Sequence, residues 1–150
     1  MRLRGFEVVE AYKNAGISLP ERKTALSAGY DIAAAENVTL LANAVSLIPT
    51  GLKAYMRQDE YLGIHIRSGL AFKNSLSLIN GQGIIDADYY NNPGNEGHIM
   101  VAVFNHSDEP VTIAKGDRVA QGIFYSYLLA DADEAVVFPA RTGGMGSTGK

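Results

Sequence analysis

The sequence predicts one domain that is built almost entirely from β-strands. The chain has 150 residues, of which 47% are hydrophobic and 16 are glycine, and this length suits a single domain with one core. Short segments alternate apolar and polar residues with a period of two, while helical periodicity is hard to find. Many short strands separated by Gly, Pro, Asn and Asp favour a β-sandwich, a barrel or a jelly roll.

The central third of the chain carries the clearest strand patterns. Residues 44–55 predict a strand, a turn at 49–51 and a second strand. Residues 61–67 alternate, with Leu62, Ile64 and Ile66 on one face. We therefore expect this segment to be a strand that covers the core with that face.

The next elements follow the same reasoning. Residues 99–105 would be apolar on both faces of a strand, which predicts a strand buried on both sides. Residues 111–113 and 121–128 predict further strands. A short helix is expected at 70–75, after the Arg67-Ser68-Gly69 turn.

Composition excludes several classes of function. The absence of cysteine rules out disulfides, thiolate zinc sites and a cysteine nucleophile. A net charge of −3 gives the chain no overall attraction to nucleic acid. No apolar run is long enough for a membrane span or a signal peptide. We expect a cytoplasmic protein with neither a membrane nor a nucleic-acid partner.

Two segments could bind anions. Arg67, Ser68 and Gly69 end an alternating strand, where a tight turn exposes N–H groups to an anion; a plain turn with a solvated arginine is the alternative. The glycine-rich end, residues 141–150, could cradle phosphate with backbone N–H groups while Arg141 and Lys150 supply charge. Its alternative is a solvated tail.

Paired carboxylates mark the segment 80–92. Asp86 and Asp88 are two residues apart, so in an extended chain they share one face, where one could hold a metal or act as a general base on water. Tyr89 and Tyr90 present one ring to each face. The alternative is a hairpin whose two carboxylates merely belong to a turn. Arg118, where a strand begins after the turn at 115–117, could pair with a carboxylate or reach a phosphate, and a structural pair with an Asp is expected.

Five short motifs, each weak as evidence alone, together indicate a family by their order and spacing. They read AGYDI at 28–32, RSGLA at 67–71, NGQGIIDADYY at 80–90, GDRVAQ at 116–121 and RTGGMGSTG at 141–149. In this order and spacing the chain resembles the homotrimeric dUTP nucleotidohydrolases. The resemblance covers about residues 25–149.

The resemblance implies an architecture. We expect an all-β, jelly-roll-type β-barrel at 1–138, followed by a flexible C-terminal arm at 139–150 that closes on the active site. Three chains would form a homotrimer with active sites shared between subunits, and Arg118 would pair with a carboxylate across the subunit contact.

The resemblance also implies hydrolysis of dUTP to dUMP and pyrophosphate. Asp86 would be the general base that activates water for in-line attack on the α-phosphate, and Tyr89 would pack under the deoxyribose. The hairpin would read uracil mainly through backbone groups. The substrate-binding residues would be Arg67, Ser68, Gly69, Asn80, Gly83, Ile84, Ile85, Tyr89, Gln121, Arg141, Met145, Gly146 and Ser147.

The implied cofactor is Mg²⁺. It would be held mainly by the three phosphates of the substrate, with no direct protein ligand and with Asp31 near its water shell. Four departures from the family pattern stand out. Met145 occupies the place of a Phe that usually stacks on uracil, and Ile66 replaces a common Pro. The chain after Tyr89 continues into a longer loop, and the last motif is one residue shorter.

Two other functions are compatible with the same fold. One is a dCTP deaminase, which would need a proton-shuttling Glu. The other is a trimeric scaffold that binds a regulatory protein, for which the extra loop at 90–98 would be the natural contact.

Overall fold

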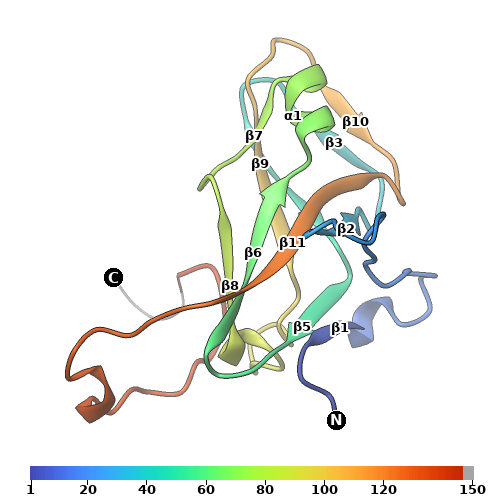
Figure 1. Ribbon diagram of the computed structural model, residues 1–150. Helices are drawn as coiled ribbons and strands as arrows, with labels where there is room; N and C mark the ends of the chain where they lie inside the picture. The colour runs from blue at the N-terminus through green and yellow to red at the C-terminus, as the bar shows by residue number, and fades with distance from the viewer. Residues whose placement is uncertain (147–150) are drawn as a thin grey trace.

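The structure is a computed structural model and describes residues 1–146. It contains eleven strands, one short α-helix and three 3-10 turns (Figure 1). The strands are β1 (Gly5–Val8), β2 (Tyr30–Ala33), β3 (Val38–Leu40), β4 (Val45–Pro49), β5 (Leu52–Tyr55), β6 (Glu60–Ile66), β7 (Leu76–Leu78), β8 (Gly83–Asp86), β9 (Met100–Asn105), β10 (Val111–Ile113) and β11 (Arg118–Ser126). The helical elements are η1 (Glu10–Tyr12), α1 (Ser68–Asn74), η2 (Ala87–Tyr89) and η3 (Asp133–Ala135).

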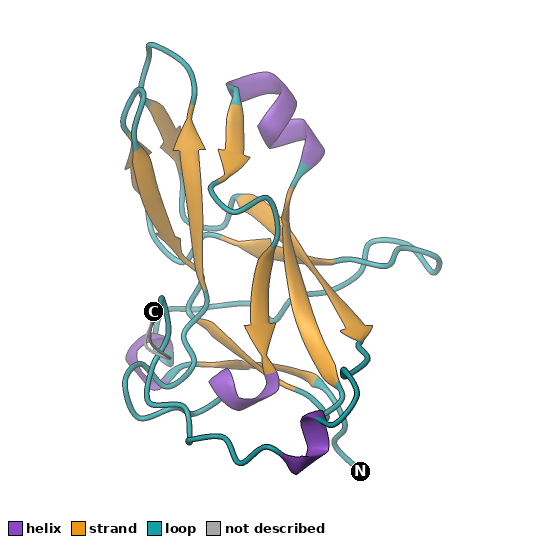
Figure 2. Ribbon diagram, turned by 90° about the vertical axis from the view of Figure 1, so that its left-hand side faces the viewer, coloured by secondary structure: helices purple, strands orange, loops and turns teal. Residues whose placement is uncertain are grey.

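Four antiparallel sheets enclose the core. The largest has the order β2-β11-β6-β8, and a second has the order β4-β9-β7. Two pairs, β1-β5 and β10-β3, complete the enclosure (Figure 2). This confirms the expected all-β fold with little helix.

The core is formed by alternate residues of facing strands. Leu62 of β6, Val101 and Val103 of β9, and Val119 of β11 are all almost completely buried. Their contacts join the two larger sheets into one hydrophobic cluster. At about 25 cal/mol per Å² of apolar surface removed from water, such burial is the main stabilising contribution to the fold.

The predicted strands at 44–55 are present, but they do not pair with each other. β4 pairs with β9, whereas β5 pairs with β1. Gly51 adopts a φ of +71°, and an added Cβ would approach Tyr12 to 3.1 Å. A side chain at this position would therefore be both strained and crowded, which explains the glycine.

Two expectations about local structure were wrong. The strand within 99–105 is buried on alternate residues only, because its other face is partly covered. Gly81 and Gly83 predict a hairpin or a bulge, but neither forms there: β7 pairs with β9 and β8 pairs with β6, with no shift of register. Local apolar content could not show that this turn passes from one sheet to another.

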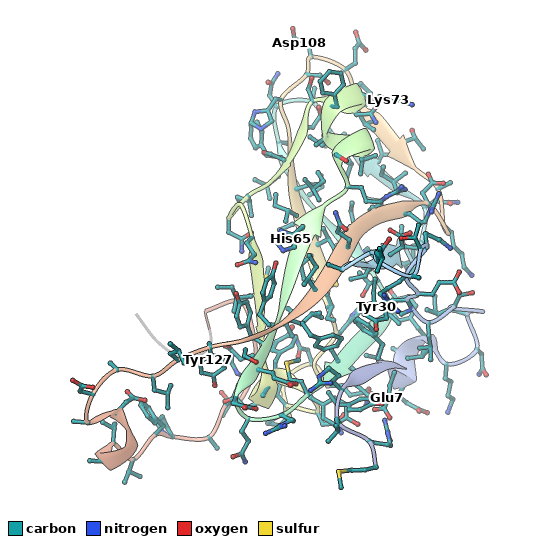
Figure 3. The ribbon with its side chains drawn as sticks, in the orientation of Figure 1. Glu7, Tyr30, His65, Lys73, Asp108 and Tyr127 are labelled. Carbon is teal, nitrogen blue, oxygen red and sulfur yellow. The ribbon has the colours of Figure 1, made fainter. Side chains whose placement is uncertain are left out.

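Strand β6 sets the distance between two groups of candidate site residues. At its beginning Tyr61 lies opposite Asp86, and at its end Arg67 leads into α1. Six residues of strand at about 3.3 Å each separate these positions by about 20 Å. Figure 3 shows Lys73 on α1 near the top of the molecule and Tyr127 beyond β11 at its lower left.

The chain after β11 leaves the sheets, passes through η3 and returns toward the end of β8 (Figure 1). Several of its apolar side chains are exposed, among them Leu128 at 97% and Val137 at 96%. None of the helices within residues 1–146 is long and apolar enough to cross a membrane.

Candidate active site

One pocket gathers the two carboxylates of the third motif and the arginine of the fifth. It encloses about 670 Å³ and is called here the carboxylate pocket. Its lining residues are Met56, Gln58, Asp86, Ala87, Asp88, Tyr127, Phe138 and Arg141. The sequence indicated that Asp86 and Arg141 belong to one site, and the structure brings them together.

The backbone around Asp86 explains why both carboxylates face the same way. β8 ends at Asp86, and the chain then tightens into η2 instead of staying extended. Arg141 Nη2 lies 2.6 Å from Asp86 Oδ2, and Arg141 Nε lies 2.7 Å from Asp88 Oδ1. The predicted common face is therefore present, but a helical turn and a shared arginine produce it.

Electrostatics hold Arg141 in its charged form. Its hydrogen bond to Asp88 and the charges of Asp88 and Asp86 raise the pKa of the guanidinium above its ordinary value, against the opposing effect of burial. The Asp86 side chain is 52% exposed. A water molecule can therefore reach this carboxylate from the pocket.

Tyr89 is only 8% exposed and lies beside Arg141, whose guanidinium carbon is 5.9 Å from the centre of the tyrosine ring. Its hydroxyl donates to the carbonyl oxygen of His98 at 2.8 Å. The arm covers the ring: a Cβ placed on Gly144 would lie 2.5 Å from Tyr89 Cε1. Only a glycine allows this approach of the arm to the ring.

A second pocket, of about 310 Å³, lies at the other end of β6 and is called here the cation pocket. It is lined by Lys23, Ser27, Gly29, Asp31, Arg67, Ser68, Arg118 and Gln121. Three cations and one carboxylate make it suited to a polyanion. Its lining residues do not overlap those of the carboxylate pocket.

Strand register assembles the cation pocket. β11 pairs with both β2 and β6, which places Gln121 opposite Asp31 on one side and His65 on the other. A Cβ on Gly29 would come within 2.2 Å of Gln121 Oε1, so the missing side chain leaves the space that Gln121 occupies. The contributions of Lys23 and Ser27 were not predicted, because neither lies in one of the five motifs. Gly29 lies in the first motif but was not assigned to a site.

Asp31 forms ion pairs with two arginines. It lies 3.2 Å from Arg118 Nη1 and 3.8 Å from Arg67 Nε, and its side chain is 16% exposed. Arg118 thus has the carboxylate partner that was expected, but this partner belongs to the same chain. The register that places β2 beside β11 accounts for it.

The segment predicted to recognise a base lies along β8. Ile85 packs against the core, whereas Ile84 is 59% exposed. Gly83 lies against Ile64, with an added Cβ at 3.2 Å from Ile64 Cβ. Asn80 lies in the preceding turn, and Gly69 in α1 has open space around it.

The arm is described as far as Gly146. Met145 is 74% exposed with a φ of +53°, and Gly146 has a φ of +93°. Ser147, which was predicted to contact substrate, lies outside the described residues.

Metal-binding side chains do not cluster in the described part of the chain. Among the side chains that the structure describes, which leave out that of residue 134, no group of three or more His, Asp or Glu could hold an ion. The histidines have other contacts: His65 bonds Tyr125, His106 bonds Ser77, and His98 Nε2 accepts from the Gly51 N–H at 2.9 Å.

A family model described as dUTPase matches residues 15–149, which is most of the chain. The chain belongs to the dUTPase family. A curated relative from Lactococcus lactis, named deoxyuridine 5'-triphosphate nucleotidohydrolase, is 56% identical over 99% of both chains. This membership confirms the resemblance inferred from the five motifs.

Solved structures of dUTPases have the same fold. The dUTPase from Streptococcus mutans is 47% identical and superposes with a TM-score of 0.81, covering 85% of this chain and 99% of that one. A variant of the dUTPase from Staphylococcus aureus phage phi11 is 20% identical with a TM-score of 0.71, covering 88% and 95%. That phage protein is described with a structural Mg(II) ion.

Proposed function

We propose that this dUTPase family member hydrolyses dUTP to dUMP and pyrophosphate. The observation that carries the proposal is the half-exposed Asp86 carboxylate, bonded in its pocket to Arg141, which in turn lies beside Tyr89. A carboxylate in this setting can accept a proton from water, and an arginine can bind phosphate oxygens.

In the proposed reaction, Asp86 accepts a proton from a water molecule whose oxygen attacks the α-phosphorus. The new P–O bond forms as the bond to the bridging oxygen of pyrophosphate breaks, and the pyrophosphate leaves with that electron pair. Arg141 must first release Asp86, because a carboxylate bonded to a guanidinium is a poor proton acceptor. The triphosphate offers Arg141 a more highly charged partner.

Substrate discrimination would follow from packing. Tyr89 would lie under the deoxyribose and leave no space for a 2′-hydroxyl. Ile85 faces the core, so at that position β8 can offer a base only its backbone groups. Such groups would reject cytosine, whose base edge leaves buried donors or acceptors unpaired.

Magnesium fits this site through the substrate. The triphosphate supplies the oxygen ligands that Mg²⁺ prefers, and bound Mg²⁺ would neutralise charge on those phosphates. Asp31, although paired with arginines, would lie near its water shell. The chain's own contribution is to bind the phosphates with Arg67, Ser68 and Gln121.

We also propose that the active site is completed between chains of a homotrimer. Within one chain the carboxylate pocket and the cation pocket lie at opposite ends of β6, about 20 Å apart. The exposed Leu128 and Val137 of the C-terminal segment favour burial against a neighbour. One chain's Asp86 would then serve phosphates bound by the Arg67 of a neighbouring chain.

Product analysis tests the reaction. The protein is incubated with Mg²⁺ and, separately, with dUTP, dCTP, dTTP or UTP, and products are resolved by anion-exchange chromatography. We expect dUMP and pyrophosphate from dUTP, and loss of both with Asp86→Asn. Deamination of dCTP would indicate the deaminase alternative, and a folded trimer without turnover would favour the regulatory scaffold.

Subunit mixing tests the shared site. Asp86→Asn removes the carboxylate of one pocket, and Arg67→Ala removes a cation of the other. If sites are shared, mixed trimers will contain some sites with both residues intact and will regain activity. Activity that stays at the level of the separate variants, despite proven subunit exchange, would contradict sharing.

A further inference from the structure

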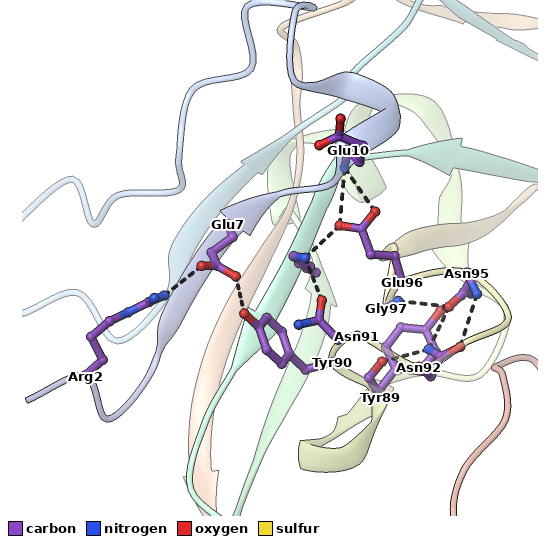
Figure 4. Close-up of polar contacts among 11 residues, drawn as sticks. Arg2, Glu7, Glu10, Tyr89, Tyr90, Asn91, Asn92, Asn95, Glu96 and Gly97 are labelled. Carbon is purple, nitrogen blue, oxygen red and sulfur yellow. Dashed lines mark hydrogen bonds and ion pairs between the residues drawn. The ribbon is translucent and has the colours of Figure 1, made fainter.

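The loop that follows Tyr89, residues 91–98, is held by its own side chains (Figure 4). Asn92 is 5% exposed and its amide donates to the carbonyl oxygen of Tyr89 at 2.7 Å. Its Oδ1 accepts from the N–H groups of Gly94 at 3.0 Å and Asn95 at 3.1 Å. These bonds turn the loop back toward Tyr89.

The turned loop points the Asn95 amide at the Tyr89 hydroxyl. Asn95 Nδ2 donates to that hydroxyl at 2.8 Å, while Asn95 Oδ1 accepts from the Gly97 N–H at 3.0 Å and from Asn92 Nδ2 at 2.7 Å. The hydroxyl in turn donates to the His98 carbonyl oxygen. Asn95 and His98 therefore fix the phenol from two directions.

The outer side of the loop is anchored to the barrel. Lys53 Nζ of β5 lies 2.6 Å from Asn91 Oδ1 and 2.6 Å from Glu96 Oε2. Glu96 also accepts from the Glu10 N–H. The Lys53 side chain is only 12% exposed, so water screens its pair with Glu96 poorly. The loop is thus a fixed support for Asn95.

The arm also lies against the ring. Gly144 lies against Tyr89, and Gly94 of the loop lies against the arm, where an added Cβ would be 2.7 Å from the carbonyl oxygen of Thr142. The loop therefore contacts both the tyrosine and the segment that covers it. No side chain could be added at either glycine without separating them.

We infer that Asn95 is a positioning residue that fixes Tyr89 and so sharpens discrimination between deoxyribose and ribose triphosphates. The inference rests on the proposed function, in which Tyr89 packs under the sugar. A phenol free to swing would leave room for a 2′-hydroxyl. A phenol held at its oxygen would not.

The test measures the ratio of kcat/KM for dUTP to that for UTP. We expect Asn95→Ala to lower this ratio about fivefold, as the loss of one hydrogen bond would. Tyr89→Phe removes the hydroxyl but keeps the ring, and we expect a similar decrease. Asn91→Gly is the matched control, because it alters the same loop without touching Asn95. Glycine adopts the φ of +57° at this position without strain, and Glu96 still holds Lys53.

The double variant decides whether Asn95 acts through Tyr89. In the Tyr89→Phe background, Asn95→Ala should change the ratio no further. Additive decreases, an unchanged ratio in Tyr89→Phe, or an equal decrease in Asn91→Gly would each overturn the inference. If Asn95→Ala does not fold, Tyr89→Phe alone decides. Failure of the unaltered protein to hydrolyse dUTP would instead refute the proposed function.

Discussion

The two pockets at the ends of β6 differ in how they are built. The cation pocket is made by neighbouring strands, whose register places Gln121 opposite Asp31. The carboxylate pocket depends on a return of the chain, since Arg141 arrives from beyond η3 to reach Asp86 and Asp88. The first is part of the barrel, and the second is completed by an arm.

This difference suggests a separate role for each pocket in the proposed reaction. A cluster of cations beside paired strands suits the binding of phosphates, whose position must be fixed before attack. An arm that lies over a carboxylate could move away to admit substrate and return to exclude bulk water, which suits the chemical step. Changes at the two pockets should therefore have different kinetic signatures.

The largest effect is expected at Asp86. Asp86→Asn removes the proton acceptor, and we expect kcat to fall by about 10²–10⁴-fold, the usual contribution of a general base. The thermal midpoint should hardly change, because the side chain is half exposed. Steady-state kinetics and calorimetry check both points. A variant with normal kcat would remove Asp86 from the mechanism.

Arg67→Ala should have the next largest effect. Loss of a charge-assisted hydrogen bond, worth about 1.5–3 kcal/mol, would lower kcat/KM by about 10- to 150-fold. Arg57→Ala removes an exposed arginine paired with Asp59 outside both pockets and serves as the control. Equal losses in both variants would show a general effect of charge, not a phosphate site.

Asp88→Asn should have a smaller effect, in the opposite direction. Asp88 holds Arg141 before substrate binds, and its side chain is 63% exposed, so the pair is worth about 0.2–1 kcal/mol. Weakening it should ease the transfer of Arg141 to phosphate and lower KM by up to about fivefold. Kinetics with dUTP at low salt measure this. A raised KM would mean that Asp88 positions the arm for substrate.

The smallest effect concerns pH. Burial lowers the pKa of His98 below its ordinary value, against the charges of Glu36 and Glu96. The unfolded chain then binds the proton more readily, so stability is full above about pH 6.5 and decreases as pH falls through the folded-state value. Protonated Nε2 could no longer accept from Gly51.

Thermal unfolding between pH 5 and pH 8 would show this dependence. His98→Gln should flatten the curve in that range, whereas His106→Gln, at an exposed histidine, should leave it unchanged. Because the His98 carbonyl accepts a hydrogen bond from the Tyr89 hydroxyl, the effect concerns the loop that holds Tyr89. A curve that stays steep in His98→Gln would assign the dependence to other groups.

Much of the barrel could be predicted from local pattern. Alternation in residues 61–67 identified β6 and its buried face, because side chains on a strand point to opposite sides in turn. β1, β2, β3 and β7 were not predicted, since none is long enough to show a clear alternation of apolar and polar residues; β10, equally short, was found because two of its three residues are β-branched and apolar. The partners of β7 and β8 were also hidden, because pairing between distant segments leaves no local trace.

The sequence by itself determined which chemical groups are present: the carboxylates at Asp86 and Asp88, the phenol of Tyr89, and the arginines at Arg67 and Arg141. Motif order was enough to indicate the family. Only the tertiary structure decided that Arg141 bridges both carboxylates and that Asp31 pairs with Arg118 in its own chain. It also decided that the loop after Tyr89 turns inward to hold it. These contacts join residues up to 87 positions apart, and strand register and chain return, not local composition, bring such residues together.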